Sequence, residues 1–253
     1  MSCYEALAGS YDALTTDVDY EKRADFLEKL LRRSAIPVRL VLDLACGTGT
    51  MTWLLTQRGY EVIGVDGSEE MLAAAMSKSG QAAGIPPVFL HQSMPRLDLY
   101  GTVDAAVCCL DSLNYLTDPK DVQRTFRRLH LFVAPGGMLV FDVNTVAKLS
   151  ALDGQVFLDE TEDTLCLWRT EYSRGLCSYY MDLFFRREDG AWDRQAELHR
   201  QRAGSCGSDG RVRSGHGCKW PLPAPCRQWK WLLRYDLPYY ILPLLLSVIF
   251  SRS

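Results

Sequence analysis

The sequence lacks a dominant charge sign and an apolar stretch long enough for a membrane-spanning helix. Lysine plus arginine number 28 and aspartate plus glutamate 31, so the net charge of −3 gives no strong signal for nucleic acid. Residues 237–250 are apolar but contain Pro238 and Pro243, and they are fewer than the about 20 apolar residues of a membrane span. We therefore expect no nucleic-acid-binding protein and no membrane-spanning segment, with a weak membrane anchor at residues 237–250 as the alternative.

The nine cysteines form neither a disulfide framework nor a zinc-binding pattern. No C-x-x-C pair is present, and the spacings of Cys206, His216, Cys218 and Cys226 fit no common zinc site, so we expect no metal. The first residues lack the basic and apolar segments of a secretory signal. These features predict free thiols in a cytoplasmic protein. The sequence does not indicate an oligomeric state.

Apolar strands alternate with amphipathic helices up to about residue 144. This order predicts an α/β fold with a doubly wound, mostly parallel sheet. A chain of 253 residues suits one such domain with a small insertion. The expected strands are 38–44, 60–65, 88–91, 103–110 and 138–143, and the expected helices are 20–33, 51–58, one that begins after Ser68, and 119–132.

A glycine-containing turn follows the first expected strand. Gly47 and Gly49 come directly after the apolar strand that carries Asp43, and the next strand ends in Asp66. Glycine lets a ligand approach the backbone closely, and an acid about 20 residues beyond such a turn can accept hydrogen bonds from a ribose. We therefore expect a nucleoside pocket, in which Asp43 steadies the turn, caps its amides or answers a ligand ammonium.

Three nucleoside ligands are common beside such a turn. A dinucleotide site has a third glycine where this chain has Thr52, which disfavours an NAD-dependent oxidoreductase. No Gly-Lys-Ser/Thr follows the turn, which excludes a phosphate-binding P-loop. The remaining common ligand is S-adenosyl-L-methionine, which carries a ribose and an adenine but no phosphate.

Two motifs and several shorter segments fit one known family. Residues 43–50 read Asp-Leu-Ala-Cys-Gly-Thr-Gly-Thr, and residues 64–68 read Gly-Val-Asp-Gly-Ser with Met71 beyond them. In this order they resemble the class I S-adenosylmethionine-dependent methyltransferases. Segments 4–7, 11–14, 111–116, 134–137, 141–144 and 197–203 also resemble the small bacterial methyltransferase-domain proteins. The resemblance covers about residues 4–203 and implies a Rossmann-like methyltransferase acting on a small molecule.

The resemblance also assigns roles to the motif residues. The turn at 47–49 would line the amino-acid part of the cofactor, and Asp66 would bind the ribose hydroxyls. Gly67 and Met71 would pack near the adenine, and Leu110 to Ser112 would end the fourth strand beside the methyl group. The expected cofactor-binding residues are Tyr11, Asp43, Ala45, Cys46, Gly47, Thr48, Gly49, Asp66, Gly67, Ser68, Met71, Gln92, Ser93, Met94, Leu110, Asp111 and Ser112.

One position departs from the family pattern. Gln92-Ser93-Met94 occupies the place where the family usually has an acid facing the adenine amine. A hydroxyl accepts a weaker hydrogen bond than a carboxylate, so we expect weaker cofactor binding than Ser93→Asp would show.

Candidates for a proton acceptor are weak. Tyr11 and Tyr4 lie in a segment that covers the cofactor in relatives, where an aromatic face favours a sulfonium; alternatively, they fill the core. Asp111 and the vicinity of Asn144 are further candidates. The remaining ones are His91, expected to be structural in a central strand, and His199, expected at the surface of a charged run. Lys22 or Arg23 could meet the cofactor carboxylate, but both are expected on a solvated helix face.

The pattern changes after residue 144. Strands expected at 164–172, 176–186 and 192–199, with turns at Arg174-Gly175 and Asp189-Gly190, predict an antiparallel insertion. It would form a lid or substrate wall over the open end of the sheet, or only stabilise or dimerise the protein. The division expected is 1–36 for the cofactor-covering segment, 37–150 for the binding domain, 151–203 for the insertion and 204–253 for the tail.

The tail does not continue the family pattern. Residues 204–225 show no helical or strand periodicity, and the helix and two strands expected from the resemblance are not recognisable. A shifted reading frame near residue 204 would explain this loss and would predict a disordered tail. A non-catalytic cofactor-binding protein or a truncated, inactive homologue is therefore the alternative to an enzyme.

Overall fold

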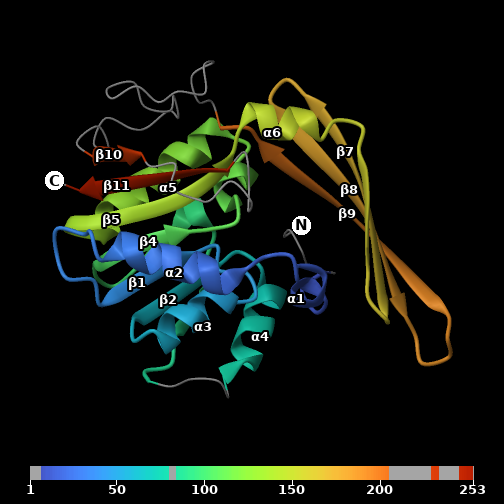
Figure 1. The fold of residues 1–253 in the computed structure, drawn as a ribbon, viewed down its shortest axis with the longest axis horizontal. Coiled ribbons are helices and arrows are strands. Elements are labelled where there is room, and N and C mark those ends of the chain that lie inside the picture. Colours follow the sequence, from blue (N-terminus) through green and yellow to red (C-terminus); the bar gives the residue numbers. More distant parts are fainter. Residues whose placement is uncertain (1–6, 80–83, 205–228, 234–244, 253) are drawn as a thin grey trace.

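The computed structural model describes residues 7–79, 84–204, 229–233 and 245–252. A seven-stranded sheet with helices on both faces forms the body, and a separate four-stranded antiparallel sheet stands beside it (Figure 1). The strand order in the body is β10-β11-β5-β4-β1-β2-β3. Within the described ranges, no helix is long and apolar enough to cross a membrane.

The five parallel strands expected from the sequence are present. They are β1 (Leu40–Leu44), β2 (Glu61–Asp66), β3 (Val88–His91), β4 (Val103–Cys108) and β5 (Val133–Asn144). The described helices are α1 (Tyr11–Leu14), α2 (Tyr20–Leu31), α3 (Thr50–Gln57), α4 (Glu69–Ser77), α5 (Pro119–Phe132) and α6 (Val146–Ala151), with the short 3₁₀ helices η2 (Met94–Arg96) and η3 (Ser112–Tyr115). The doubly wound α/β prediction is thus confirmed.

Three helices begin directly after a residue whose side chain caps the first turn. The side chains of Asp19, Ser68 and Asp118 accept hydrogen bonds from backbone amides in the first turns of α2, α4 and α5, as such side chains commonly do. Two apolar clusters then form the core. One lies between α2, α3 and the strands, and the other lies between α5 and the opposite face of the sheet. The carboxyl ends of the strands remain open between these layers.

The prediction for the tail is wrong for two segments. β10 (Trp229–Leu233) and β11 (Leu245–Arg252) pair antiparallel with each other, and β11 pairs antiparallel with β5 from Asn144 to Met138. β11 therefore covers the edge of β5, which removes unpaired backbone groups from that edge. Cys206, His216, Cys218 and Cys226 lie outside the described residues, as does most of the tail.

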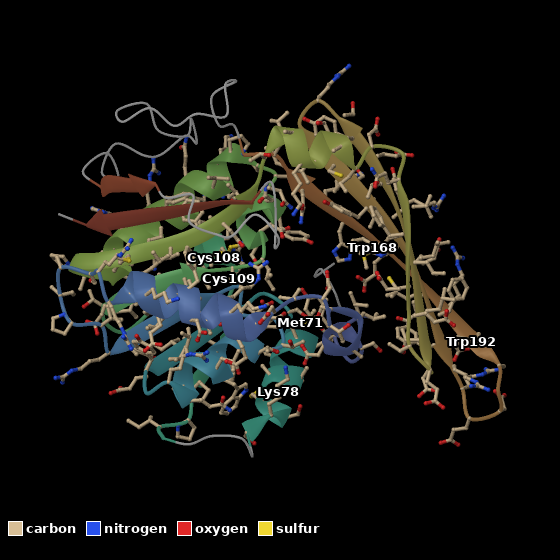
Figure 2. The ribbon with its side chains drawn as sticks, viewed as in Figure 1. Met71, Lys78, Cys108, Cys109, Trp168 and Trp192 are labelled. Carbon is tan, nitrogen blue, oxygen red and sulfur yellow. The ribbon has the colours of Figure 1, made fainter. Side chains whose placement is uncertain are left out.

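The insertion has one strand more than the sequence predicts. β7 (Thr164–Ser173), β8 (Leu176–Arg186) and β9 (Trp192–Arg202) are confirmed, and β6 (Val156–Glu160) adds an edge strand. β6 and the preceding α6 are short, and their sequences show no clear strand or helix pattern. Trp168 lies on the side of this sheet that faces the body, whereas Trp192 lies near its far tip (Figure 2). The insertion meets the body at the carboxyl ends of β4 and β5, where β9 contacts η3 and the amide of Gly204, just after β9, donates to the Asn144 carbonyl.

Candidate functional site

A cavity of about 290 Å³ lies at the carboxyl ends of β1, β2 and β4. All but two of the residues expected to bind the cofactor line it, and the two exceptions are Gly49 and Asp111. The lining residues that sequence reasoning missed are Tyr20, Thr50, Met51, Val65, Pro95, Cys109, Tyr115 and Leu116. Most of these are immediate neighbours of the predicted residues, so adjacency in sequence was the only signal available for them.

The two glycines of the turn serve different purposes. Gly47 has a φ of +55°, and a Cβ at this position would meet nothing within 4 Å, so it leaves the cavity open. Gly49 has a φ of +72°, and its Cβ would lie 2.8 Å from the Cβ of Ala75 and 3.3 Å from the Phe89 ring. Gly49 does not line the cavity, and its lack of a side chain lets the start of α3 pack closely against α4 and β3.

Asp66 ties the end of β2 to the turn after β1. Its Oδ2 accepts the Gly47 amide at 2.8 Å, and its Oδ1 accepts the Ser68 amide at 2.9 Å. Burial raises the pKa of this carboxyl, although the amide bonds oppose that shift. Each carboxylate oxygen can accept more than one hydrogen bond, so the group can still serve a ligand hydroxyl in the cavity.

Asp43 steadies the turn through a side chain rather than through backbone amides. It is 2% exposed, and its Oδ2 accepts the Thr52 hydroxyl at 2.6 Å. Burial raises the pKa of Asp43 to about 6. The residue that replaces the third glycine of a dinucleotide motif is thus the partner of Asp43. The alternative that Asp43 caps the turn amides is wrong for the described residues.

The α1 helix covers the cavity and is fastened to the turn. Oδ1 of Asp12 accepts the Thr48 hydroxyl at 2.7 Å, and Oδ2 lies 2.5 Å from Nζ of Lys78 in the segment after α4. Tyr11 lines the cavity, and burial raises its hydroxyl pKa well above the usual range. Leu7, Tyr11 and Leu14 pack on β7 and β8. This short helix therefore lies between the turn and the insertion (Figure 1). Tyr4 lies outside the described residues.

The opposite end of the cavity is mostly apolar. Met71 is buried there, and Met94, Pro95 and Val65 line the same space. Ser93 lines it as predicted. The Gln92 side chain instead exchanges two hydrogen bonds with the Asp98 backbone, at 3.0 and 2.8 Å. A flat apolar ring fits this end better than a charged group would.

Two successive residues just after β4 have a left-handed conformation. Leu110 and Asp111 have φ values of +56° and +51°, and such non-glycine residues are uncommon and cluster at functional sites. The Asp111 amide donates to Oδ1 of Asp142 at 2.8 Å, and Nε2 of Gln201 donates to Oδ2 of Asp111. Burial, and next the charge of Asp142, raise the pKa of Asp111 to about 7.

Arg23 belongs to this end of the site, contrary to the prediction of a solvated position. Its Nη1 lies 3.4 Å from Oδ2 of Asp142, and its side chain is 18% exposed. Lys22, one residue earlier, is 67% exposed and pairs with Asp19. A helix places adjacent residues about 100° apart, and α2 turns only Arg23 toward the sheet.

The two candidate histidines also differ from expectation. His199 is only 2% exposed rather than at the surface; its Nε2 lies 2.6 Å from Oε2 of Glu197, and its ring meets Tyr115 edge-on. His91 ends an edge strand, not a central one. Its half-exposed ring forms a hydrogen bond with the Gly67 carbonyl and contacts the Glu69 carboxylate. His199 therefore borders the β4 end of the site, whereas His91 lies at the β3 edge.

A polar network joins the insertion to the body beside Asp111. Asn114 donates to the carbonyls of Asn144 and Arg202 and accepts the Asn144 amide at 2.8 Å. Oε1 of Gln201 accepts from Asn144 Nδ2 at 2.9 Å and from the Tyr179 hydroxyl at 3.1 Å. Gln201 thus connects β9 and β8 to β5 and to Asp111, which fixes the insertion at this end of the cavity.

Comparisons with known proteins agree with this geometry. A methyltransferase-domain family matches residues 41–137. Putative methyltransferase YqeM of Bacillus subtilis (strain 168) is 36% identical over 202 residues, covering 79% of each protein. Glycine/sarcosine N-methyltransferase of Halorhodospira halochloris is 26% identical, covering 73% of this chain and 75% of that protein.

Solved structures give the same result. An S-adenosylmethionine-dependent methyltransferase from Clostridium acetobutylicum ATCC 824 superimposes with a TM-score of 0.73 at 26% identity, covering 99% of both chains. The sugar N-methyltransferase KedS8 from Streptoalloteichus sp. ATCC 53650, at 20% identity and a TM-score of 0.74, shows the same fold over 96% of this chain and 92% of that one. The chain therefore belongs to the class I S-adenosylmethionine-dependent methyltransferases.

Proposed function

We propose that this protein binds S-adenosyl-L-methionine in the cavity at the ends of β1, β2 and β4 and transfers its methyl group to a small-molecule acceptor. The observation that carries the proposal is the junction of Gly47 and Asp66. There a glycine, which has no side chain, and a carboxylate face one cavity at the ends of two adjacent strands. Family membership supports the same cofactor.

The residues present fit such a nucleoside. Gly47 leaves free space where a Cβ would stand, which suits the close approach of the methionyl part. Asp66 offers carboxylate oxygens to ribose hydroxyls, and the apolar surface of Met71 and Met94 suits an adenine ring. Tyr11 at the α1 end provides an aromatic face that favours a cationic sulfur.

When bound, the cofactor supplies a methyl group on a positively charged sulfur, which is already an activated leaving group. The protein then has to align the acceptor with that methyl group and exclude water. Alignment alone can contribute roughly 7–11 kcal/mol of barrier lowering. α1, which packs on β7 and β8 of the insertion, covers the end of the cavity that contains Tyr11, Leu110 and Ser112. We assign the acceptor to that end.

Asp111 is the best placed of the proposed catalytic candidates. It stands between two lining residues, Leu110 and Ser112, and is partly exposed. Tyr11 is placed to cover the cofactor rather than to take a proton, because burial raises its pKa. His199 borders the same end through Tyr115 and is a second candidate.

The experiment that tests the proposal measures binding first and turnover second. Calorimetry and thermal unfolding should show binding and stabilisation by S-adenosylhomocysteine and none by NAD. Radiolabelled S-adenosyl-L-methionine with a panel of small amines, alcohols and phenols then separates an enzyme from a non-catalytic binder. Folded protein that binds neither cofactor form would contradict the proposal.

A further inference from the structure

The end of the cavity next to β9 combines carboxylates with aromatic rings. Asp111 and Asp142 lie side by side there, joined through the Asp111 amide at 2.8 Å. Among residues 7–79 and 84–204, Arg23 is the one cation within 4 Å of either carboxylate. Tyr11 and Tyr115 line the cavity at the same end. A positively charged ligand group would find both counter-charge and aromatic faces here.

The Asp111 carboxylate is fixed by one hydrogen bond and can accept further ones. Gln201 donates to its Oδ2, and no described residue donates a hydrogen bond to its Oδ1. Leu110 and Asp111, which follow the end of β4, both have left-handed φ values. Strained backbone of this kind persists only where the surroundings over-determine it. Asp111 does not itself line the cavity, but both of its neighbours do and the residue is partly exposed, so a ligand that extends past Leu110 and Ser112 would meet Oδ1.

We propose that the methyl acceptor is a primary or secondary amine, bound as an ammonium ion and deprotonated by Asp111, with Gln201 as the residue that positions this carboxylate. The inference rests on the proposed function and names the acceptor class for it. The amine passes a proton to Asp111, and its lone pair attacks the methyl carbon. The N–C bond forms as the C–S bond breaks, the bonding electron pair stays on sulfur, and the products are an N-methylamine and S-adenosylhomocysteine.

The strength of the base favours an amine over an alcohol. An alkylammonium group with a pKa near 10.4 gives its proton to a carboxylate of pKa about 7 at a penalty of about three orders of magnitude. For a hydroxyl as weakly acidic as water, with a pKa near 15.7, the penalty would be about nine orders of magnitude. A phenol is acidic enough, but its phenolate would stand beside Asp142 as a like charge.

The groups around Asp111 come from every element packed against it. The negative charge of Asp142 raises its pKa, whereas Lys148, the Gln201 hydrogen bond and Arg23 lower it, in that order. The other titratable groups at this end are Tyr11 of α1, Tyr115 of η3, Cys108 and Cys109 at the end of β4, Tyr179 of β8, and Glu197 and His199 of β9.

Three matched pairs of probes test the acceptor class on the full-length protein saturated with S-adenosylhomocysteine. The pairs are tyramine and tyrosol, benzylamine and benzyl alcohol, and glucosamine and glucose, each at millimolar concentration in calorimetry. At least one amine should bind tenfold or more tightly than its hydroxyl partner. Its binding should weaken about tenfold from pH 8 to pH 6, as Asp111 takes up a proton. With labelled S-adenosyl-L-methionine, the label should enter the amine nitrogen of that probe.

Variants then assign the effect to this carboxylate. Asp111→Asn, which keeps the side-chain shape, should remove the preference for the amine and leave S-adenosylhomocysteine binding in place. Gln201→Leu should shift the pH midpoint of amine binding upward, because the lost hydrogen bond favours the charged carboxylate. Asp182→Asn is the control, because this carboxylate pairs with Arg169 and Arg194 on the outer side of β8. The variant should change neither the amine preference nor the pH midpoint of amine binding.

The outcomes separate the two proposals. Normal S-adenosylhomocysteine binding with equal or absent binding of all three amines and their partners overturns the amine assignment alone. So does methylation at a hydroxyl or phenol oxygen, or an Asp111→Asn variant with unchanged amine preference. If a variant does not fold, the pH dependence in the wild-type protein decides. A wild-type protein without affinity for S-adenosylhomocysteine overturns the proposed function, and the amine assignment falls with it.

Discussion

Gly49 makes the sharpest stability prediction, because its role is steric and can be worked out from two quantities. Its φ of +72° is strained for any residue with a side chain, at about 1–2 kcal/mol. An added Cβ would lie 2.8 Å from the Ala75 Cβ and 3.3 Å from the Phe89 ring. Overpacking of this kind costs about 1–3 kcal/mol. Gly49→Ala should therefore lower the free energy of unfolding by about 2–5 kcal/mol.

Gly59→Ala is the matched control for backbone strain. Gly59 has a φ of +90°, and a Cβ there would meet nothing within 4 Å, so only the strain of about 1–2 kcal/mol applies. The difference between the two variants, about 1–3 kcal/mol, isolates the steric contact with α4 and β3. A domain is stable by only about 5–15 kcal/mol, so this difference is easily resolved.

Urea unfolding followed by circular dichroism measures both variants under one set of conditions. The denaturation midpoint of Gly49→Ala should fall well below that of Gly59→Ala, with similar dependence on urea concentration. Equal midpoints for the two variants would show that the contact with Ala75 and Phe89 relaxes freely. In that case the close packing of α3 against α4 would not explain why the turn carries a glycine at this position.

Four further predictions concern the cavity and its charges. Gly47→Ala should lose about 1–2 kcal/mol of stability, because position 47 has a φ of +55°. Since Gly47 lines the cavity, the variant should also bind S-adenosylhomocysteine more weakly in calorimetry, and an unchanged affinity would contradict that expectation. Asp12→Asn should accelerate S-adenosylhomocysteine dissociation several-fold in stopped-flow fluorescence, because α1 loses its ion pair. Ser93→Asp should tighten S-adenosylhomocysteine binding, and equal calorimetric affinities would refute it. The raised pKa values of Asp43, about 6, and Asp111, about 7, mean that the fold binds protons that the unfolded chain has released, so stability should fall as pH rises from about 4 to 7; a urea midpoint higher at pH 8 than at pH 5.5 would contradict the burial of these carboxyls.

Local patterns predicted most of the body of the fold. The caps at Asp19, Ser68 and Asp118, and the strand that ends in Asp66, each depend on residues close together in sequence, so short-range rules apply. The tail was different. Nothing in its composition indicated β10 and β11, because pairing with β5 is a contact between residues about 100 positions apart. Strand propensity depends strongly on such partners.

Contacts between distant side chains explain the errors at the site. Thr52 correctly counts against a dinucleotide motif, but its hydrogen bond to Asp43 could not be predicted, because that partner lies on another element. Arg23 and Lys22 are adjacent basic residues, and only the placement of α2 on the sheet shows that one faces Asp142. The sequence records which groups are present, whereas the pairings depend on how the helices lie against the strands.

β9 shows why a charged stretch can hide a site. Its residues alternate sides, so Glu197, His199 and Gln201 face the body while Leu198 and Arg200 face outward. Leu198 is 46% exposed and His199 is 2% exposed, the reverse of what their polarity alone would predict. Burying polar groups costs free energy unless they are hydrogen-bonded, and Gln201 meets that condition by bonding Asp111, Asn144 and Tyr179. A strand whose polar residues turn inward therefore needs polar partners on the body, and β9 finds one in Asp111.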